Sequence, residues 1–299
     1  MEDILKGASD MHIHTSPDVS PRKSTDLEIA EEWEKTGMKG GVVKCHFADT
    51  TGRAAILSAL HPNLNIYGGL VLNRQAGGIN PDAAERMAQA GGRYIWFPTL
   101  DSLSYRKFHF RNDPSADLSP YISVCDENGK ILPAVYDVLD VAAKYDLVVG
   151  TGHIGGREGL PLVLEAAKRG VNRIVLTHAE NPATNFSIEE QKRCVAVGAV
   201  VEHSFFTVYH NCVSWELVAE QIRAVGTDHT YLVTDFGQLN SPGSADGLKM
   251  FAEGLLERGF TEEDIDKLIR KNPEKLFAKW REFCIYIRSH QAYGCEQYV

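Results

Sequence analysis

Six of the eleven histidines lie at or next to the ends of short apolar runs that have the composition of buried β-strands. Two of them, His12 and His14, are separated by one residue, so on a strand both side chains point to the same face. Two imidazoles and a carboxylate such as Asp235 suit a divalent ion such as Zn, Mn or Fe. The residue types therefore predict a metal site. The six histidines are His12, His14, His46, His153, His178 and His203.

Eight apolar runs alternate with amphipathic segments along the chain, and most runs are continuously apolar, as expected of strands covered on both faces. The predicted strands are residues 9–14, 41–46, 65–73, 94–100, 147–153, 173–178, 199–203 and 231–235. The predicted helices are residues 26–36, 81–90, 134–144, 159–168, 187–197, 214–224, 246–258 and 262–270. Eight strand–helix repeats favour an α/β fold, the (β/α)8 TIM barrel, in which the carboxyl ends of all strands meet on one face.

A doubly wound open sheet is the alternative fold. Such a sheet usually has a Gly-rich phosphate loop after its first strand, whereas residues 11–17 contain no glycine. We therefore expect a single barrel domain over residues 1–299, with a core of residues 8–280 and a C-terminal tail of residues 281–299. The longest connection, residues 101–132, follows the fourth strand, and connections of this length are usually lids or binding loops.

The composition limits the classes of partner. The chain has 31 Lys and Arg residues against 40 Asp and Glu residues, a formal net charge of −9, and we expect no nucleic-acid partner because nucleic-acid binding needs a basic face. No apolar run approaches the roughly 20 residues that span a bilayer, and the first residues lack a signal-peptide pattern. We expect a cytoplasmic protein without membrane contacts, and the six scattered cysteines predict free thiols.

The strand-end motifs resemble those of the amidohydrolase superfamily over most of the chain. The resemblance is greatest to the poorly characterised TIM-barrel metal-dependent hydrolases of that superfamily. The matching motifs are Asp10-Met11-His12-Ile13-His14, Gly150-Thr151-Gly152-His153, Leu176-Thr177-His178-Ala179-Glu180, Val233-Thr234-Asp235-Phe236-Gly237 and Asn272-Pro273-Glu274-Lys275-Leu276-Phe277.

This resemblance implies a mono- or dinuclear metal hydrolase that acts on a small molecule. It implies that His12 and His14 bind the first metal together with Asp235. It implies that His153 and His178 bind a second metal or complete the first site. Zn is the cation we expect, with Mn or Fe as alternatives and one or two ions per chain. Barrels of this kind often self-associate, so we also expect a homo-oligomer.

The fourth strand departs from the superfamily pattern. Dinuclear members usually bridge their metals there with a carbamylated Lys or a Glu, but residues 97–101 contain neither. Asp101 is a candidate ligand with a shorter side chain, and Lys44, two residues before His46, is a second candidate. Three interpretations of Lys44 stay open, since a bare buried ammonium is costly: a bridging carbamate, a cation that binds a substrate carboxylate or oxyanion, or a structural ion-pair partner.

Further side chains are candidates for substrate binding. Glu202 and His203 are neighbours on the seventh strand, so only one of them points inward. The alternation favours Glu202 and Ser204 on one side and His203 on the other, and His203 has both a substrate-binding and a structural interpretation. Glu180 is a candidate partner that orients an imidazole. The candidate substrate-binding residues are His46, His203, Asp101, Lys107 and Arg74.

The candidate residues predict hydrolysis by water that a metal ion makes acidic. Asp235 would accept the proton and pass it to the leaving group, while His178 or Lys44 would help to stabilise the oxyanion. The expected substrates are small amides, cyclic amides or lactones. A metal-dependent decarboxylase of a small aromatic or unsaturated acid is an alternative, because such relatives share the H-x-H motif. The third possibility is a barrel without enzymatic activity that only binds a metal or a small molecule.

Overall fold

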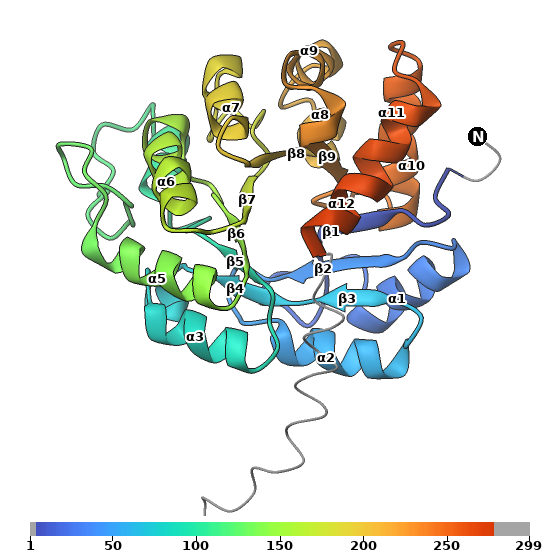
Figure 1. Ribbon diagram of the computed structural model, residues 1–299, viewed down its shortest axis with the longest axis horizontal. Coiled ribbons are helices and arrows are strands. Elements are labelled where there is room, and N and C mark those ends of the chain that lie inside the picture. Colours follow the sequence, from blue (N-terminus) through green and yellow to red (C-terminus); the bar gives the residue numbers. More distant parts are fainter. Residues whose placement is uncertain (1–3, 278–299) are drawn as a thin grey trace, which may run out of the picture.

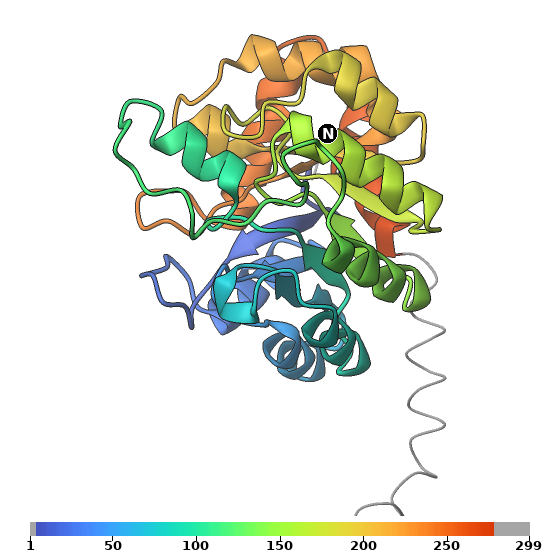
Figure 2. The same cartoon turned by 90° about the vertical axis from the view of Figure 1, so that its left-hand side faces the viewer.

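The computed structural model describes residues 4–277, and within this range parallel strands form an inner layer with helices outside it (Figures 1 and 2). The strands are β1 (Ser9–His14), β2 (Gly40–Lys44), β3 (Asn65–Tyr67), β4 (Gly69–Val71), β5 (Tyr94–Trp96), β6 (Val148–Gly150), β7 (Arg173–Leu176), β8 (Val200–Ser204) and β9 (Thr230–Val233). The α-helices are α1 (Asp26–Lys35), α2 (Thr51–Leu60), α3 (Pro81–Gln89), α4 (Leu103–His109), α5 (Pro133–Lys144), α6 (Gly156–Lys168), α7 (Ile188–Val195), α8 (Phe205–Tyr209), α9 (Trp215–Val225), α10 (Ser244–Leu256), α11 (Glu262–Asp266) and α12 (Asn272–Phe277).

The strands close into a barrel. They pair in the orders β1-β2-β3 and β4-β5-β6-β7-β8-β9, all parallel, and only Gly68 separates β3 from β4, which together form the third barrel strand. The last strand meets the first, because the backbone N–H of Asp235 donates to His12 at 2.9 Å and that of His14 donates to Phe236 at 2.8 Å. This closure confirms the predicted (β/α)8 barrel and excludes the open sheet.

Asp10 fixes the seam between the first and last strands. Its buried carboxylate accepts hydrogen bonds from the hydroxyls of Thr234 at 2.5 Å and Ser244 at 2.7 Å. Trp33 of α1 in turn donates to Ser244 at 3.0 Å. Burial raises the pKa of Asp10 to about 6, although these hydrogen bonds lower it. The network holds β1 against β9, and so determines where His12 lies relative to the end of the last strand.

Several strands end earlier than the apolar pattern predicts. His46, His153, His178 and Asp235 follow the ends of their strands by two or three residues. The cause is backbone conformation, since His178 and Asp235 have φ values of 32° and 53°, and Gly152 has a φ of 62°. A residue in the left-handed region cannot continue an extended ladder. The apolar run therefore extends beyond the strand into the turn that carries the functional side chain.

Most predicted helices are present with ends shifted by a few residues, but the pattern missed four helices. These are α2, α8, α12 and α4, the last of which lies inside the long connection that we expected to be a lid or binding loop. In Figure 2 this connection is the teal-to-green segment that projects at the upper left. The helix predicted over residues 262–270 is α11 followed by a π-helical turn at Lys267–Lys271. The predicted C-terminal tail lies outside the described residues.

The core has an inner and an outer part. Two outer clusters of apolar side chains fill the space between the strands and the helices. The inner cluster fills the barrel, and α12 closes its amino-terminal end. The inner cluster consists of Met11, Val42, Val71, Tyr94, Trp96, Val148, Val175, Tyr231, Val233, Leu276 and Phe277.

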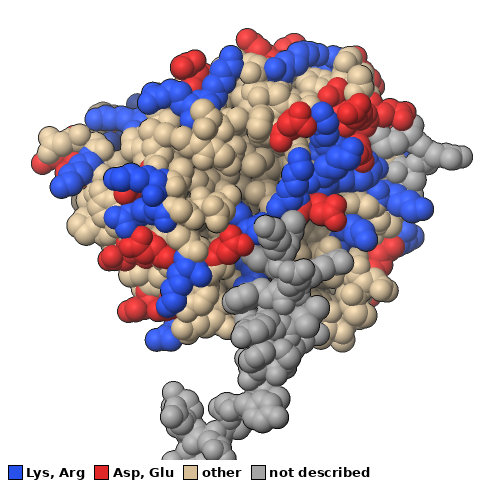
Figure 3. Space-filling model, viewed as in Figure 1, with Lys and Arg blue, Asp and Glu red and all other residues tan. Residues whose placement is uncertain are grey.

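On the surface, Lys and Arg side chains are interspersed with Asp and Glu (Figure 3). Ion pairs connect some of them, such as Lys267 with Asp228 at 3.1 Å and Lys271 with Asp266 at 2.8 Å. Of the helices in residues 4–277, none has the length and apolar character that crossing a membrane requires. The four cysteines in this range are free thiols, as predicted for them.

Candidate metal centre

His12, His14 and Asp235 converge at the carboxyl end of the barrel. Nε2 of His12 lies 3.0 Å, and Nε2 of His14 lies 3.3 Å, from the same oxygen, Oδ1 of Asp235. One ligand atom from each residue lies within 4.8 Å of the other two. Two imidazole nitrogens and a carboxylate oxygen are a donor set that fits a divalent transition metal, so these three residues are the ones that would hold it.

An irregularity in β1 brings both histidines to this point. The register of β1 against β2 shifts between Asp10 and Ile13. As a result Met11 packs in the inner barrel cluster and Ile13 in an outer one, while His12 and His14 both face Asp235. Strand irregularities of this kind often re-aim side chains next to active sites.

Glu202 of β8 supports His12 from the other side of its ring. The Oε1 atom of Glu202 lies 2.9 Å from Nδ1 of His12, and both side chains are fully buried. Oε2 accepts a hydrogen bond from the Tyr231 hydroxyl at 2.6 Å. Burial alone would raise the pKa of Glu202, but the charge and hydrogen bond of His12 lower it. An ionised Glu202 accepts the Nδ1 proton and directs Nε2 towards Asp235.

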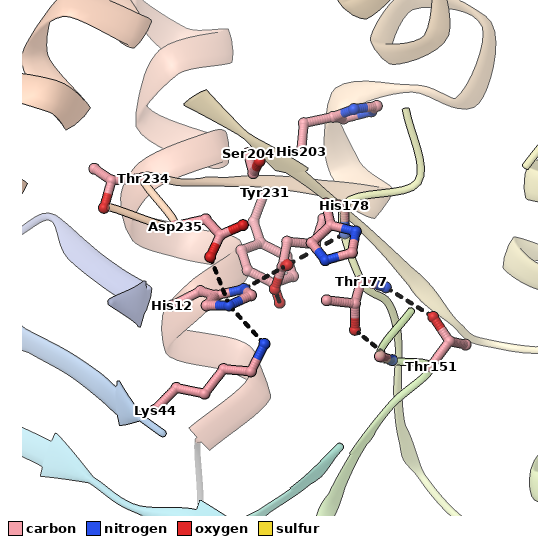
Figure 4. A network of polar contacts seen from close by, with 12 residues as sticks. His12, Lys44, Thr151, Thr177, His178, His203, Ser204, Tyr231, Thr234 and Asp235 are labelled. Carbon is pink, nitrogen blue, oxygen red and sulfur yellow. Dashed lines mark hydrogen bonds and ion pairs between the residues drawn. The ribbon is translucent and has the colours of Figure 1, made fainter. Parts of the chain in front are cut away.

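Lys44 contacts Nε2 of His12, the ring nitrogen that also faces Asp235. Its Nζ lies 2.8 Å from Nε2 of His12 and 5.3 Å from the centre of the Trp96 ring, and Figure 4 shows the side chain directed at His12 below Asp235. Burial lowers the pKa of Lys44 to about 8, while the charges of Asp235 and Glu202 counteract this shift. Within residues 4–277, no carboxylate lies within ion-pair distance of Nζ, so the contact to His12 is its main polar interaction.

Three further imidazoles line the wall of the site. The ring of His46 stacks on His14 with centroids 4.6 Å apart, and the ring of His153 lies 4.8 Å from His178. The Nδ1 atoms of His14, His153 and His178 are buried without a hydrogen-bond partner. Burial lowers the pKa of His46 and of His153 well below the ordinary value. These imidazoles are therefore neutral and available as ligands or hydrogen-bonding groups.

The structure thus brings five of the six strand-end histidines together, along with Lys44 and Asp235. Only the group of His12, His14 and Asp235 is compact enough for three ligand atoms to share one ion within residues 4–277. His153 and His178 lie beside this group. Whether they hold a second ion stays a prediction.

The sixth histidine, His203, does not join the site. Its side chain is fully buried and its Nδ1 lies 2.9 Å from Oε2 of Glu180. Glu180 also accepts hydrogen bonds from the backbone of Ser204 and the hydroxyl of Thr207. In Figure 4, His203 points away from His12. The substrate-binding interpretation of His203 is corrected on this point, because its neighbour Glu202 takes the inward position on β8. Glu180 orients an imidazole as expected, and that imidazole is His203.

The other predicted substrate-binding residues lie in the loops around the site. Asp101 accepts a hydrogen bond from the backbone N–H of Arg74 at 2.9 Å, and the side chain of Arg74 is exposed. Lys107 is exposed on α4. None of these three side chains contacts the His12–His14–Asp235 group. Asp101 lies at a loop junction, and Thr99 is the residue whose side chain contacts His46. The end of β5, the fourth strand of the barrel, therefore presents no Lys or Glu side chain that could bridge two metal ions.

Two residues at the site were not recognised as functional from the sequence. The strand alternation put Glu202 on the side of β8 opposite His203, but it did not show which of the two sides faces inward. Tyr105 of α4 places its ring 4.8 Å from His153, and only its position in the longest connection pointed to it.

The sequence matches the family model described as "Family of unknown function (DUF6282)" over residues 7–202. No curated protein matches the chain.

Many solved structures resemble this chain. An amidohydrolase from Pseudomonas aeruginosa has 13% identity and a TM-score of 0.61 over 92% of this chain and 96% of its own. A putative 2-pyrone-4,6-dicarboxylic acid hydrolase from Pseudomonas putida has 16% identity and a TM-score of 0.56 over 91% and 97%. A 2,6-dihydroxybenzoate decarboxylase from Rhizobium has 13% identity and a TM-score of 0.53 over 91% and 99%. The likeness confirms the expected resemblance at the level of the fold.

Proposed function

Since this chain belongs to the family of unknown function DUF6282, we propose an activity from its own site: metal-dependent hydrolysis of an amide, cyclic amide or lactone bond in a small molecule. The main observation behind this proposal is that only one of the two carboxylate oxygens of Asp235 contacts the histidines. Oδ1 faces the Nε2 atoms of His12 and His14 at 3.0 and 3.3 Å. Oδ2 makes no hydrogen bond or ion pair in the described part of the chain, and the side chain is 14% exposed. This difference supports a metal-binding role for Oδ1 and a proton-accepting role for Oδ2.

A divalent cation held by His12, His14 and Asp235 supplies Lewis acidity, which polarises a carbonyl group and makes water more acidic. Burial alone would raise the pKa of Asp235, but the charge and hydrogen bond of His12 hold it well below the usual range. Asp235 is therefore ionised and able to accept a proton. Oδ2 takes the proton that water loses as the water oxygen bonds to the carbonyl carbon. It returns this proton to the nitrogen or oxygen leaving group as the C–N or C–O bond breaks.

Lys44 and His178 support the same step. Both side chains are buried at the wall of the site, and the Nζ protons of Lys44 are placed beside Nε2 of His12. Burial lowers the pKa of His178, so its imidazole is neutral. We assign to these two residues the binding of the substrate oxygen that gains negative charge. A carbamate on Lys44 is the alternative state, and mass spectrometry of the intact protein at neutral pH distinguishes the two.

A decarboxylase of a small aromatic or unsaturated acid is the second candidate. Two observations favour it: one compact three-ligand group within residues 4–277, and the absence of a Lys or Glu at the end of the fourth strand. A 2,6-dihydroxybenzoate decarboxylase is among the structures with this fold. One metal per chain together with carbon dioxide released from an aromatic acid would support this candidate.

The test begins with protein stripped of metal and reconstituted with Zn, Mn or Fe. The reconstituted protein is screened against small amides, cyclic imides, lactones and aromatic acids, with isotope-labelled water as the solvent. Hydrolysis puts one labelled oxygen into the carboxylate product, whereas decarboxylation releases carbon dioxide. A preparation that resists reconstitution with every metal contradicts both functions.

Zinc is the cation that we propose for this site, with Mn or Fe as alternatives, because His and Asp ligands bind several divalent ions. We also propose that the protein acts as a homo-oligomer in the cytoplasm. Elemental analysis of the purified protein and light scattering at several concentrations test the metal and the assembly.

A further inference from the structure

The helix α4 is held over the site by hydrogen bonds to the barrel. Ser102, which caps the helix, donates from its hydroxyl to the backbone carbonyl of His153 at 2.9 Å. Glu158 of α6 accepts hydrogen bonds from the hydroxyls of Ser104 at 3.2 Å and Ser123 at 2.5 Å. The long connection is therefore attached on both sides of α4, and the helix has a defined position above the histidines.

Tyr105 of α4 contacts the site, and its ring lies against two imidazoles. Its ring centroid lies 4.8 Å from that of His153 and 3.9 Å from that of His109. Nδ1 of His109 also lies 2.9 Å from the backbone oxygen of Tyr105, one helical turn away. These two ring contacts limit the rotation of the phenol ring.

The hydroxyl of Tyr105 is the part of the side chain that stays available. It has no hydrogen-bond partner among residues 4–277, and the side chain is only half-buried. Burial raises the pKa of the phenol, the charge of Arg106 lowers it, and the charge of Asp235 raises it. The hydroxyl is therefore a neutral donor. The ring of Tyr105 contacts His153, which itself lies 4.8 Å from His178, so Tyr105 stands at the imidazole wall of the site.

We propose that the Tyr105 hydroxyl donates a hydrogen bond to the substrate oxygen that gains negative charge when water attacks the carbonyl carbon. This inference rests on the proposed hydrolase function, and it makes Tyr105 a catalytic residue supplied by the long connection. A donor fixed before the reaction stabilises such an oxygen more than it stabilises the neutral carbonyl, so it lowers the barrier rather than only tightening substrate binding. The substrate must accordingly present a carbonyl oxygen towards α4.

Replacement of Tyr105 by Phe tests the hydroxyl, because Tyr105→Phe keeps the ring between the two imidazoles. We expect kcat to fall by about 10²–10³-fold, as for the loss of one oxyanion donor, with KM changed by less than about three-fold.

The matched control is Tyr121→Phe, in the same connection, where the ring packs against Phe110 with centroids 6.4 Å apart. The control should keep the wild-type kcat. A Tyr105→Phe variant with wild-type kcat overturns the inference.

A binding measurement separates this inference from the proposed function. Methylphosphonate carries a tetrahedral anionic centre and needs no turnover, so its affinity for the metal-loaded protein is measured by calorimetry. We expect Tyr105→Phe to bind methylphosphonate about ten-fold or more weakly than wild type and Tyr121→Phe to bind it equally, at equal metal content. If no amide or lactone is hydrolysed but this difference is found, the hydrolase function fails and the donor role of Tyr105 stands. Equal affinities of wild type and Tyr105→Phe, or no binding by wild type, overturn the donor role.

Discussion

The carboxylate of Glu202 lies 2.9 Å from Nδ1 of His12, at the ring nitrogen opposite to the one that faces Asp235. The next residue, His203, forms the same kind of pair with Glu180, also at 2.9 Å, away from the metal centre. Successive side chains of β8 thus take part in two buried carboxylate–imidazole pairs on opposite sides of the strand. Only the pair of Glu202 with His12 lies where it can influence a bound metal. The pair of Glu180 with His203 therefore serves as a control for the general effect of removing a buried charge.

Glu202→Gln should weaken metal binding by about ten-fold or more, because the charge that orients His12 and increases the basicity of its ring is lost. The affinity is measured by competition with a chromophoric chelator. Glu180→Gln removes a buried charge from an equivalent pair and should leave the metal affinity within about two-fold of wild type. Equal losses of affinity in the two variants would show that the effect comes from general destabilisation.

Metal binding should become tighter as the pH rises. Burial lowers the pKa of His12 but the charge of Asp235 raises it, and the result is a pKa of about 9. Below that pH, a cation must displace a proton from His12, so the affinity should rise by up to about ten-fold per pH unit and level off above pH 9.

The folding stability of the metal-free protein should change in the opposite direction and fall as the pH rises. The stabilisation from protonated His12 is complete below its ordinary pKa of 6.5 and disappears as the pH rises through about 9. Calorimetry in buffers of different ionisation enthalpy measures the proton released, and identical affinities at low and high pH would contradict this account.

Asp235→Asn should reduce turnover by at least about 10²-fold, because the amide accepts no proton at Oδ2 and is a weaker metal ligand. The fold should persist, since the backbone hydrogen bond from Asp235 to His12 does not depend on the side chain. Activity is measured with saturating metal, with circular dichroism as the control for folding. A variant that keeps full activity would refute the role of Asp235 as the proton acceptor.

Gly152→Ala should destabilise the barrel by at least about 2 kcal/mol. Gly152 has a φ of 62°, and a Cβ there would lie 2.1 Å from the backbone oxygen of Phe97. Gly170 is the matched control, with a φ of 83° and nothing within 4 Å of an added Cβ, so Gly170→Ala should cost only about 1 kcal/mol. Urea unfolding measures both. Equal losses of stability in the two variants would contradict a steric clash between a Cβ at position 152 and the backbone oxygen of Phe97.

The pattern of the sequence was enough to predict that His12, His14 and Asp235, the candidate metal ligands, converge. His12 and His14 are two residues apart, so a strand puts them on one face. Asp235 ends the last apolar run, and closure of a barrel puts that run beside the first one. Both inferences follow from periodicity and from the closed topology, which depend on neighbours along the chain and on the order of the strands. For the same reason the eightfold repeat predicted the barrel itself.

Tertiary packing decided the rest. The sequence could not show that His203 pairs with Glu180 while Glu202 supports His12, because the choice of the inward side chain depends on how β8 sits between β7 and β9. It did not predict that left-handed backbone conformations end the strands before His178 and Asp235. Apart from its position in the longest connection, the sequence gave no reason to single out Tyr105, because a loop's path is set by the surfaces that it packs against rather than by its own periodicity. Local spacing determines which face a side chain takes on its own strand, whereas its partners from distant segments are determined only when the barrel closes and the loops pack over it.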